Sequence, residues 1–128
     1  MSLNKNMRVM IVDDYNTMLR ILRNLLRQLD FNNVDEATNG QEALDKLHHT
    51  PADLIISDWN MAPMTGLDLL KSVRGNTNLR KTPFIMVTAE SKTENVIAAK
   101  QAGVSNYIVK PFNAETLRAK ITSVFPGA

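Results

Sequence analysis

Five polar residues follow or end short apolar runs in this chain: Asp13, Asp14, Asp58, Thr88 and Lys110. Carboxylates that meet at one place repel one another, and a proton or a cation must relieve that repulsion. Because the chain has no cysteine, a metal there would have oxygen ligands, the kind that Mg²⁺ prefers. An ammonium and a hydroxyl beside the metal suit a transferring phosphoryl group. These residue types therefore predict a divalent-metal site for phosphoryl chemistry.

Asp58 is the carboxylate that we expect to react. A carboxylate can attack phosphorus as a nucleophile and give an acyl phosphate. We expect Asp58 on the central strand of a sheet, between Asp13 on one side and Lys110 on the other. There the Lys110 ammonium would offset charge on the phosphoryl oxygens, and the Thr88 hydroxyl would donate a hydrogen bond to one of them.

Short apolar runs rich in branched residues predict the strands that carry these side chains. The runs cover residues 8–12, 54–56, 84–87 and 107–109, with a weaker one over 34–37. Helical spacing fills the intervals. It is clearest in the first interval, where one face collects Met18, Leu22, Leu25, Leu26 and Leu29. A second helix over 41–48 would turn inward Ala43, Leu44 and Leu47.

Glycines and polar residues mark the ends of the remaining helices. Gly75 would end the third helix, and Ser91 with Glu94 three residues later forms a capping-box pattern for the start of the fourth. Gly103 suits the left-handed position that closes that helix. Asn113 would cap the last helix with its side chain.

Five strand–helix units predict a single doubly wound (βα)5 domain of the α/β class. Right-handed crossovers would cover both faces of its parallel sheet with helices, and 128 residues have room for one such core. The carboxyl ends of the strands share one edge, so the polar residues should converge there. We expect the domain over 7–125, a flexible N-terminus over 1–6 and a tail over 126–128, and the start Met1-Ser2-Leu3 is also consistent with a cloning remnant.

Composition argues against nucleic-acid and membrane partners. The formal net charge is +2, and the basic residues are spread along the chain rather than gathered in a block. No run approaches the roughly twenty apolar residues that cross a bilayer, and the N-terminus lacks the apolar stretch of a signal peptide. The absence of cysteine fits a reducing compartment. We therefore expect a cytoplasmic protein, and a monomer.

Four motifs occur in order along the chain: Asp13-Asp14, Asp58-Trp59-Asn60-Met61, Thr88-Ala89 and Lys110-Pro111. Together they resemble the receiver domains of bacterial two-component response regulators, and among these the CheY-like chemotaxis receivers. The resemblance covers about residues 7–125 and includes the stretches VTAES and GVSNYIVKPF. It implies the flavodoxin-like or CheY-like strand order 2-1-3-4-5.

The resemblance also implies a role for each matching acid. Asp58 would be the phosphorylated residue, and its phosphodonor would be a phosphohistidine on a sensor kinase. Asp14, Asp58 and the backbone carbonyl of Asn60 would hold Mg²⁺, with Mn²⁺ as a second candidate. Asp13 would act on that metal through a bound water.

Other matching residues would read the phosphorylated state. The resemblance implies that Thr88 and Lys110 bind the phosphoryl group and that Tyr107 changes rotamer with Thr88 on activation. The residues flanking the pocket would be Trp59, Ala89 and Glu90. The surface for a flagellar motor switch protein would include Lys92, Tyr107 and Lys120, and a dedicated phosphatase is a further expected partner.

The sequence departs from the family pattern in the loop after Asp58. Proline usually follows the methionine of the Asp-x-x-Met run directly, whereas here Ala62 intervenes and Pro63 comes next. Proline restricts its own backbone and that of the residue before it, so the loop over the metal should differ. Thr65 replaces an acid common at that position, and we expect it to face outward with little effect.

Alternative interpretations remain at individual residues. Tyr107 alone would be an edge residue packing its ring on the sheet. His48 and His49 do not share a helix face, so we discount them as a metal or relay pair. Pro111 permits a cis bond after Lys110 that would aim the lysine into the site.

Several functions compete with a phosphorylation switch that transfers and hydrolyses only its own phosphoryl group. A phosphatase with an aspartyl intermediate would share Asp58 but would need a substrate pocket. A flavin or nucleotide carrier would need a phosphate loop where this chain has Asp13 and Asp14. A receiver that binds its partners constitutively would not need the complete set of acids. Within the receiver class, a phosphorelay protein is the alternative to a motor regulator.

Overall fold

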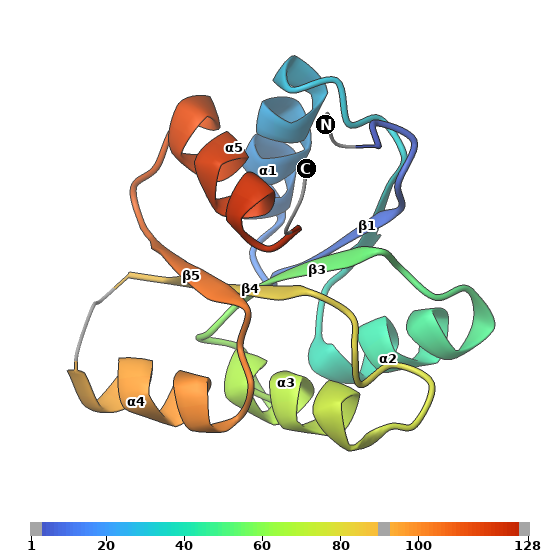
Figure 1. The fold of residues 1–128 in the computed structure, drawn as a ribbon, viewed down its shortest axis with the longest axis vertical. Coiled ribbons are helices and arrows are strands. Elements are labelled where there is room, and N and C mark those ends of the chain that lie inside the picture. The colour runs from blue at the N-terminus through green and yellow to red at the C-terminus, as the bar shows by residue number, and fades with distance from the viewer. Residues whose placement is uncertain (1–3, 90–92, 126–128) are drawn as a thin grey trace.

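The computed structural model describes residues 4–89 and 93–125 and has strands and helices in strict alternation (Figure 1). The strands are β1 (Val9–Val12), β2 (Val34–Ala37), β3 (Leu54–Asp58), β4 (Phe84–Thr88) and β5 (Asn106–Val109). The helices are α1 (Asn16–Gln28), α2 (Gly40–His49), α3 (Gly66–Gly75), α4 (Thr93–Gln101) and α5 (Ala114–Ser123). All strand pairs are parallel, in the order β2-β1-β3-β4-β5. The predicted fold class and strand order are confirmed.

Helices cover both faces of the sheet, with α1 and α5 on one side and α2, α3 and α4 on the other (Figure 1). Alternate strand residues supply the two cores. In β3, Leu54 and Ile56 pack in the cluster that contains α1 and α5, while Ile55 packs in the cluster that contains α2 and α3. A strand that is buried on both faces reads as a continuous apolar run, which is why β1, β3 and β4 were visible in the sequence.

Most of the expected helix ends are confirmed. Gly75 is the last residue of α3, and Gly103 has a φ of 92° just beyond α4. The Asn113 side chain accepts a hydrogen bond from the Thr116 amide at the start of α5. The cap expected from Ser91 lies outside the described residues.

Helix faces and strand bounds differ slightly from the prediction. Leu19 is buried in α1 although the predicted stripe omits it. The strands β3 and β4 run on to Asp58 and Thr88, because the register continues through Asp58 beside Val87 and through Thr88 beside Val109. The apolar run stops earlier than the backbone pairing does, and the expected position of Asp58 and Thr88 at the ends of these strands agrees with the pairing.

Arg74, in the last turn of α3, ties together the loops that enter β4 and β5. Its guanidinium donates hydrogen bonds to the Gly103 carbonyl (2.8 Å), to the Thr82 carbonyl (2.6 Å) and to the Arg80 carbonyl (3.1 Å). A longer contact of 3.4 Å reaches the Ser105 hydroxyl. These loops lie at the amino ends of the strands, opposite the edge where the polar residues were expected.

We expect Arg74→Ala to lower the free energy of unfolding by about 2–4 kcal/mol, because several loop carbonyls lose a charged donor. Arg74→Lys should recover only part of this loss, since one ammonium cannot reach all the carbonyls. Urea unfolding of the parent and both variants measures the effect. A change below about 0.5 kcal/mol for Arg74→Ala, the size of an ordinary surface substitution, would contradict the role of Arg74 in tying these loops together.

Candidate functional site

The ends of four strands bring the predicted polar residues to one edge of the sheet. Asp13 and Asp14 follow β1, Asp58 ends β3, Thr88 ends β4 and Lys110 follows β5. Because the strands are parallel and in register, these ends share the carboxyl edge. Residues that are far apart in the sequence are thus neighbours.

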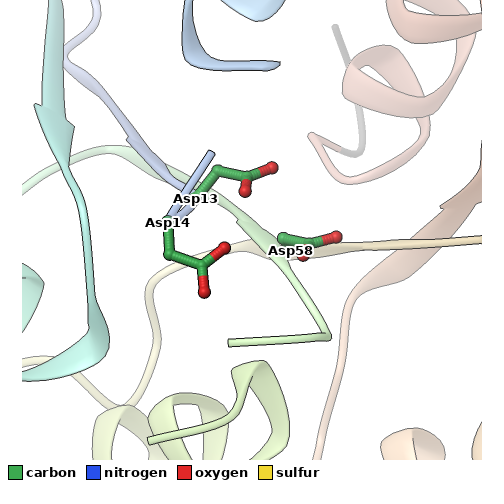
Figure 2. A group of neighbouring side chains, drawn as sticks. All are labelled: Asp13, Asp14 and Asp58. Carbon is green, nitrogen blue, oxygen red and sulfur yellow. The ribbon is translucent and has the colours of Figure 1, made fainter. Parts of the chain in front are cut away.

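The three acids form a tight cluster. Carboxylate oxygens of Asp13, Asp14 and Asp58 lie within 4.8 Å of one another, and Figure 2 shows the first two leaving the end of β1 beside Asp58 on β3. Asp13 is 1% exposed and Asp58 4% exposed, whereas Asp14 is exposed. The cluster therefore has two buried acids at its base and one at its mouth.

Asp13 is held from the backbone on both sides. Its amide donates to the Ala37 carbonyl (3.1 Å), and its Oδ1 accepts from the Tyr15 amide (3.0 Å). The pKa of Asp13 is raised from 3.8 to about 6, chiefly by burial; the nearby charges of Asp58 and Asp14 also raise it, while the Tyr15 amide and the Lys110 ammonium lower it. This carboxylate is thus costly to ionise without a cation nearby.

Lys110 supplies positive charge to the same cluster. Its Nζ lies 2.9 Å from Asp58 Oδ1, and its amide donates to the Thr88 carbonyl (2.8 Å). The bond between Lys110 and Pro111 is cis, as the sequence suggested. The contact to Asp58 is an ion pair without the angles of a hydrogen bond, and within the described residues Asp58 Oδ1 makes no hydrogen bond.

The donor set fits a hard divalent cation. Within the described part of the chain, the buried Asp13 Oδ2 has no hydrogen-bond partner, which is expensive for a buried carboxylate, and Asp58 Oδ1 has the Lys110 ion pair but no hydrogen bond. Asp14 adds a third carboxylate at the mouth. Asn60, whose carbonyl was the fourth predicted ligand, lies two residues beyond Asp58 in the exposed loop before α3. An oxygen-only set of this kind matches Mg²⁺ or Mn²⁺.

The predicted switch residues lie side by side at the other flank of the site. Thr88 is buried, and Trp59 and Tyr107 are partly buried. All three line a cavity of about 10 Å³ that α4 closes with Asn95, Val96 and Ala99. A cavity of this size has no room for an organic ligand.

The structure also places some of the other predicted flanking and surface residues. Ala89 is exposed directly after β4. Lys120 Nζ lies 5.3 Å from the centre of the Tyr107 ring, so these two predicted surface residues are neighbours. Glu90 and Lys92 lie outside the described residues.

A capping box that the sequence did not lead us to expect forms the start of α3. The Thr65 hydroxyl accepts from the Asp68 amide, and the Asp68 carboxylate accepts from the Thr65 amide, both at 3.1 Å. Thr65 is therefore a helix cap, and the expectation that it has little effect missed this role. The Thr-x-x-Asp spacing was the available signal.

Gly66 lets α3 begin directly against the end of β3. A Cβ on Gly66 would lie 2.2 Å from the Asp58 carbonyl oxygen and 2.8 Å from Met86 Sδ. The Gly66 amide also donates to the Trp59 carbonyl (2.9 Å). The backbone of Asp58 is thus fixed from the side of α3, a feature that spacing alone did not reveal.

The loop with the displaced proline is anchored on both sides. The bond between Ala62 and Pro63 is cis, and Met61 before it is 5% exposed in the core. After it, Met64 lies so close to Gly40 that a Cβ there would be 2.4 Å from the Met64 sulfur. Methionine contacts to α2 and the core therefore hold the loop that carries Asn60.

Comparison with known proteins agrees with this geometry. Residues 9–122 match the response regulator receiver domain, and the chain belongs to that family as a CheY-like receiver of a two-component response regulator. It is 52% identical over 123 residues to the chemotaxis protein CheY-3 of Vibrio cholerae, covering 96% of this chain and 95% of that one. It is 50% identical over 119 residues to the chemotaxis protein CheY of Pseudomonas aeruginosa, covering 93% and 96%.

Solved structures show the same fold. The chemotaxis response regulator CheY4 of Vibrio cholerae has a TM-score of 0.87 at 35% identity, over 94% of this chain and 99% of that one. The receiver domain of a histidine kinase from Syntrophus aciditrophicus has a TM-score of 0.85 at 30% identity, over 95% and 92%. In the described residues of this chain, no helix is both long and apolar enough to span a bilayer.

Gly66→Ala should destabilise the protein by about 1–3 kcal/mol and weaken Mg²⁺ binding, because backbone atoms of Asp58 cannot move away as a flexible side chain would. Gly75→Ala is the matched control in the same helix, where a Cβ would meet nothing within 4 Å. Denaturant unfolding and Mg²⁺ titration measure both variants. Equal behaviour of the two would show that α3 does not constrain Asp58.

Metal-free protein should lose stability as the pH rises from about 4 to about 6. The folded-state pKa of Asp13, about 6, exceeds its ordinary value of 3.8, so in this window the folded state holds more protons than the unfolded state. The cost, about 3 kcal/mol, is fully present above pH 6. Unfolding in chelator across this range measures it.

Asp13→Asn should remove that slope and stabilise the metal-free protein at pH 7, because the amide oxygen can still accept from the Tyr15 amide without carrying charge. The same variant should bind Mg²⁺ more weakly. An unchanged pH slope in Asp13→Asn would assign the effect to another group.

Proposed function

We propose that Asp58 accepts a phosphoryl group from a phosphohistidine of a sensor kinase, and that this modification switches a binding surface. The single observation that carries the proposal is the buried Asp58 carboxylate, paired with Lys110 at 2.9 Å and clustered with Asp13 and Asp14. One nucleophilic oxygen, one fixed cation and a set of metal ligands are what an in-line phosphoryl transfer requires.

In the transfer, an Asp58 oxygen forms a bond to phosphorus while the bond from phosphorus to the donor imidazole nitrogen breaks, and that nitrogen takes up a proton. Lys110 offsets negative charge on the phosphoryl oxygens, and the Thr88 hydroxyl donates to one of them. Hydrolysis reverses the modification: water attacks phosphorus, the bond to Asp58 breaks, and phosphate leaves.

Asp13, Asp14, Asp58 and the Asn60 carbonyl would hold Mg²⁺, or Mn²⁺, in this site. When bound, the cation supplies charge neutralisation for the phosphoryl oxygens. The chain's own part is to position Asp58, for which Gly66 and the ion pair with Lys110 are the contacts.

The switch would run from Thr88 to Tyr107 through the small cavity that they share with Trp59. A hydroxyl drawn toward the phosphoryl group changes the space beside the Tyr107 ring, and the rotamer of Tyr107 changes the surface near Lys120. Only a partner that prefers one conformation shifts the population.

The names of the relatives favour chemotaxis as the pathway, with a flagellar motor switch protein as the output partner and a phosphatase as a further one. A stand-alone phosphorelay receiver is the second candidate, favoured by the similarity to a receiver domain of a histidine kinase. Binding assays with and without a phosphoryl mimic separate the two. A motor partner must prefer the mimic form.

Trp59 provides the direct test, because it is the only tryptophan and adjoins Asp58. We expect its fluorescence to change on adding Mg²⁺ and again on adding a small acyl-phosphate donor, with one phosphoryl group in the intact mass. Asp58→Asn should abolish the second change and the adduct. An adduct that persists in Asp58→Asn, or turnover of a generic phosphate ester by the parent, would replace the proposal with another acceptor or with a phosphatase.

A further inference from the structure

The edge strand β2 has an unusual sequence for a strand. It reads Val-Asp-Glu-Ala, although acids are depleted in strands. β2 pairs with β1 on one side only and lies at the end of the sheet order. An edge strand normally presents unpaired amides and carbonyls, to which another strand can add. Asp35 and Glu36 therefore lie on the strand whose outer backbone edge no other strand of the described sheet covers.

The pairing with β1 shows which backbone groups face outward. The Val9 amide donates to the Asn33 carbonyl, and the Asp13 amide donates to the Ala37 carbonyl. In this parallel register, every second residue of β2 turns its backbone groups toward β1. The backbone groups of Val34 and Glu36 consequently point away from the sheet.

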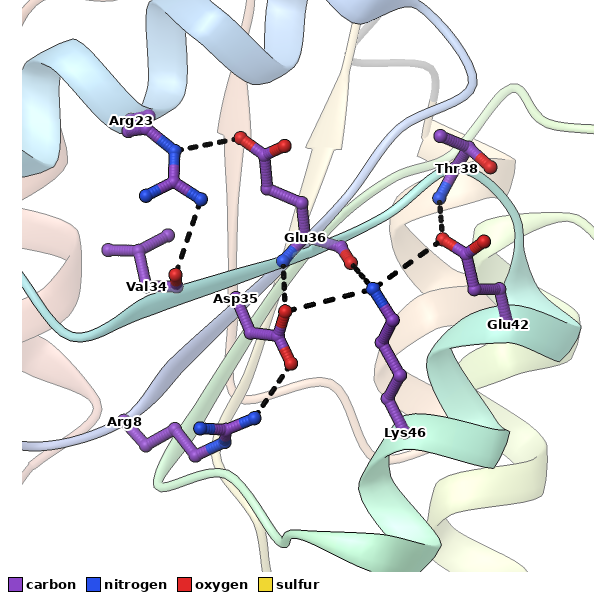
Figure 3. Close-up of polar contacts among 8 residues, drawn as sticks. All are labelled: Arg8, Arg23, Val34, Asp35, Glu36, Thr38, Glu42 and Lys46. Atoms are coloured by element: carbon purple, nitrogen blue, oxygen red, sulfur yellow. Dashed lines mark hydrogen bonds and ion pairs between the residues drawn. The ribbon is translucent and has the colours of Figure 1, made fainter.

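Side chains hydrogen-bond three of these outward groups, the Val34 carbonyl and the amide and carbonyl of Glu36 (Figure 3). Arg23 donates to the Val34 carbonyl (3.3 Å) and Lys46 to the Glu36 carbonyl (2.6 Å). The Asp35 carboxylate accepts from the Glu36 amide at 2.9 Å. Just beyond the strand, the Thr38 amide donates to Glu42 (2.8 Å).

Ion pairs hold the same side chains in place. Arg23 pairs with Glu36 at 2.8 Å, and Arg8 pairs with Asp35 at 2.7 Å (Figure 3). Lys46 Nζ lies 3.7 Å from Asp35 and 4.0 Å from Glu42. Partly exposed pairs contribute little to stability. These pairs instead hold side chains in position. Arg23 of α1 and Lys46 of α2 extend over the open edge of β2, and the acids of β2 pair with them there.

We propose that Arg23, Asp35, Glu42 and Lys46, here called the edge clamp, close β2 against strand addition by a second copy of this chain. An incoming strand needs the Val34 and Glu36 groups that the clamp already uses, and would have to displace charged side chains to reach them. The acids that weaken β2 as a strand are thus the residues that keep its edge closed. The edge clamp shares no residue with the acidic cluster.

The test replaces the two cations by an apolar side chain of similar length. Arg23→Met with Lys46→Met should leave the fold intact and open the edge, so that the weight-average mass in sedimentation rises toward twice the monomer mass at millimolar concentration. The parent should stay monomeric over the same range.

Arg20→Met with Lys71→Met is the matched control, with the same change of charge and apolarity on exposed residues of α1 and α3. It should remain monomeric. If the clamp variant also remains monomeric, or if the control associates to the same extent, the proposal is overturned.

Amide exchange tests the clamp in the unaltered protein and needs no variant to fold. The Glu36 and Thr38 amides should exchange at least tenfold more slowly than the same amides in an unstructured peptide. Asp35→Ala should release the Glu36 amide while leaving the Thr38 amide protected. Exchange of both amides at peptide rates in the parent would show that the clamp does not form.

Discussion

The parallel sheet holds three carboxylates close together at the carboxyl ends of its strands, and the other features of the site are arranged around this cluster. Asp13 and Asp58 are almost fully buried, and Asp14 lies with them in one cluster. Burial raises the pKa of Asp13, and the neighbouring charges of Asp58 and Asp14 add to that effect, so ionising the cluster is costly. A cluster of this kind is tolerated because a cation, or a lysine such as Lys110, can offset it.

The surrounding fold fixes that cluster by contacts of the backbone as much as of side chains. Parallel register sets the ends of β1 and β3 beside each other. Gly66 allows α3 to begin against the carbonyl of Asp58, and the capping box of Thr65 and Asp68 fixes where that helix starts. The Asp58 carboxylate therefore lies on a strand that is held by a helix terminus, which favours a reproducible geometry.

Elsewhere in the molecule, charged side chains donate hydrogen bonds to exposed backbone carbonyls in two separate places. Arg74 donates hydrogen bonds to loop carbonyls at the amino ends of β4 and β5, and the edge clamp bonds the outward Val34 carbonyl and both backbone groups of Glu36. In both places charged side chains from neighbouring helices replace water as hydrogen-bond partners. At the carboxyl edge, by contrast, Asp13 Oδ2 has no hydrogen-bond partner among the described residues, and Asp58 Oδ1 has the ion pair with Lys110 but no hydrogen bond.

The sequence by itself determined the order of the elements, the two buried cores and the identity of the clustered acids. These follow from local signals: apolar runs long enough to mark strands buried on both faces, caps such as Asn113, and polar residues at strand ends. Only the tertiary structure decided the close approach of Gly66 to Asp58, the reach of Arg74 across separate loops, and the clamp on β2. Each of these joins residues of different elements or loops through backbone groups, which carry no residue-specific pattern for a sequence to display.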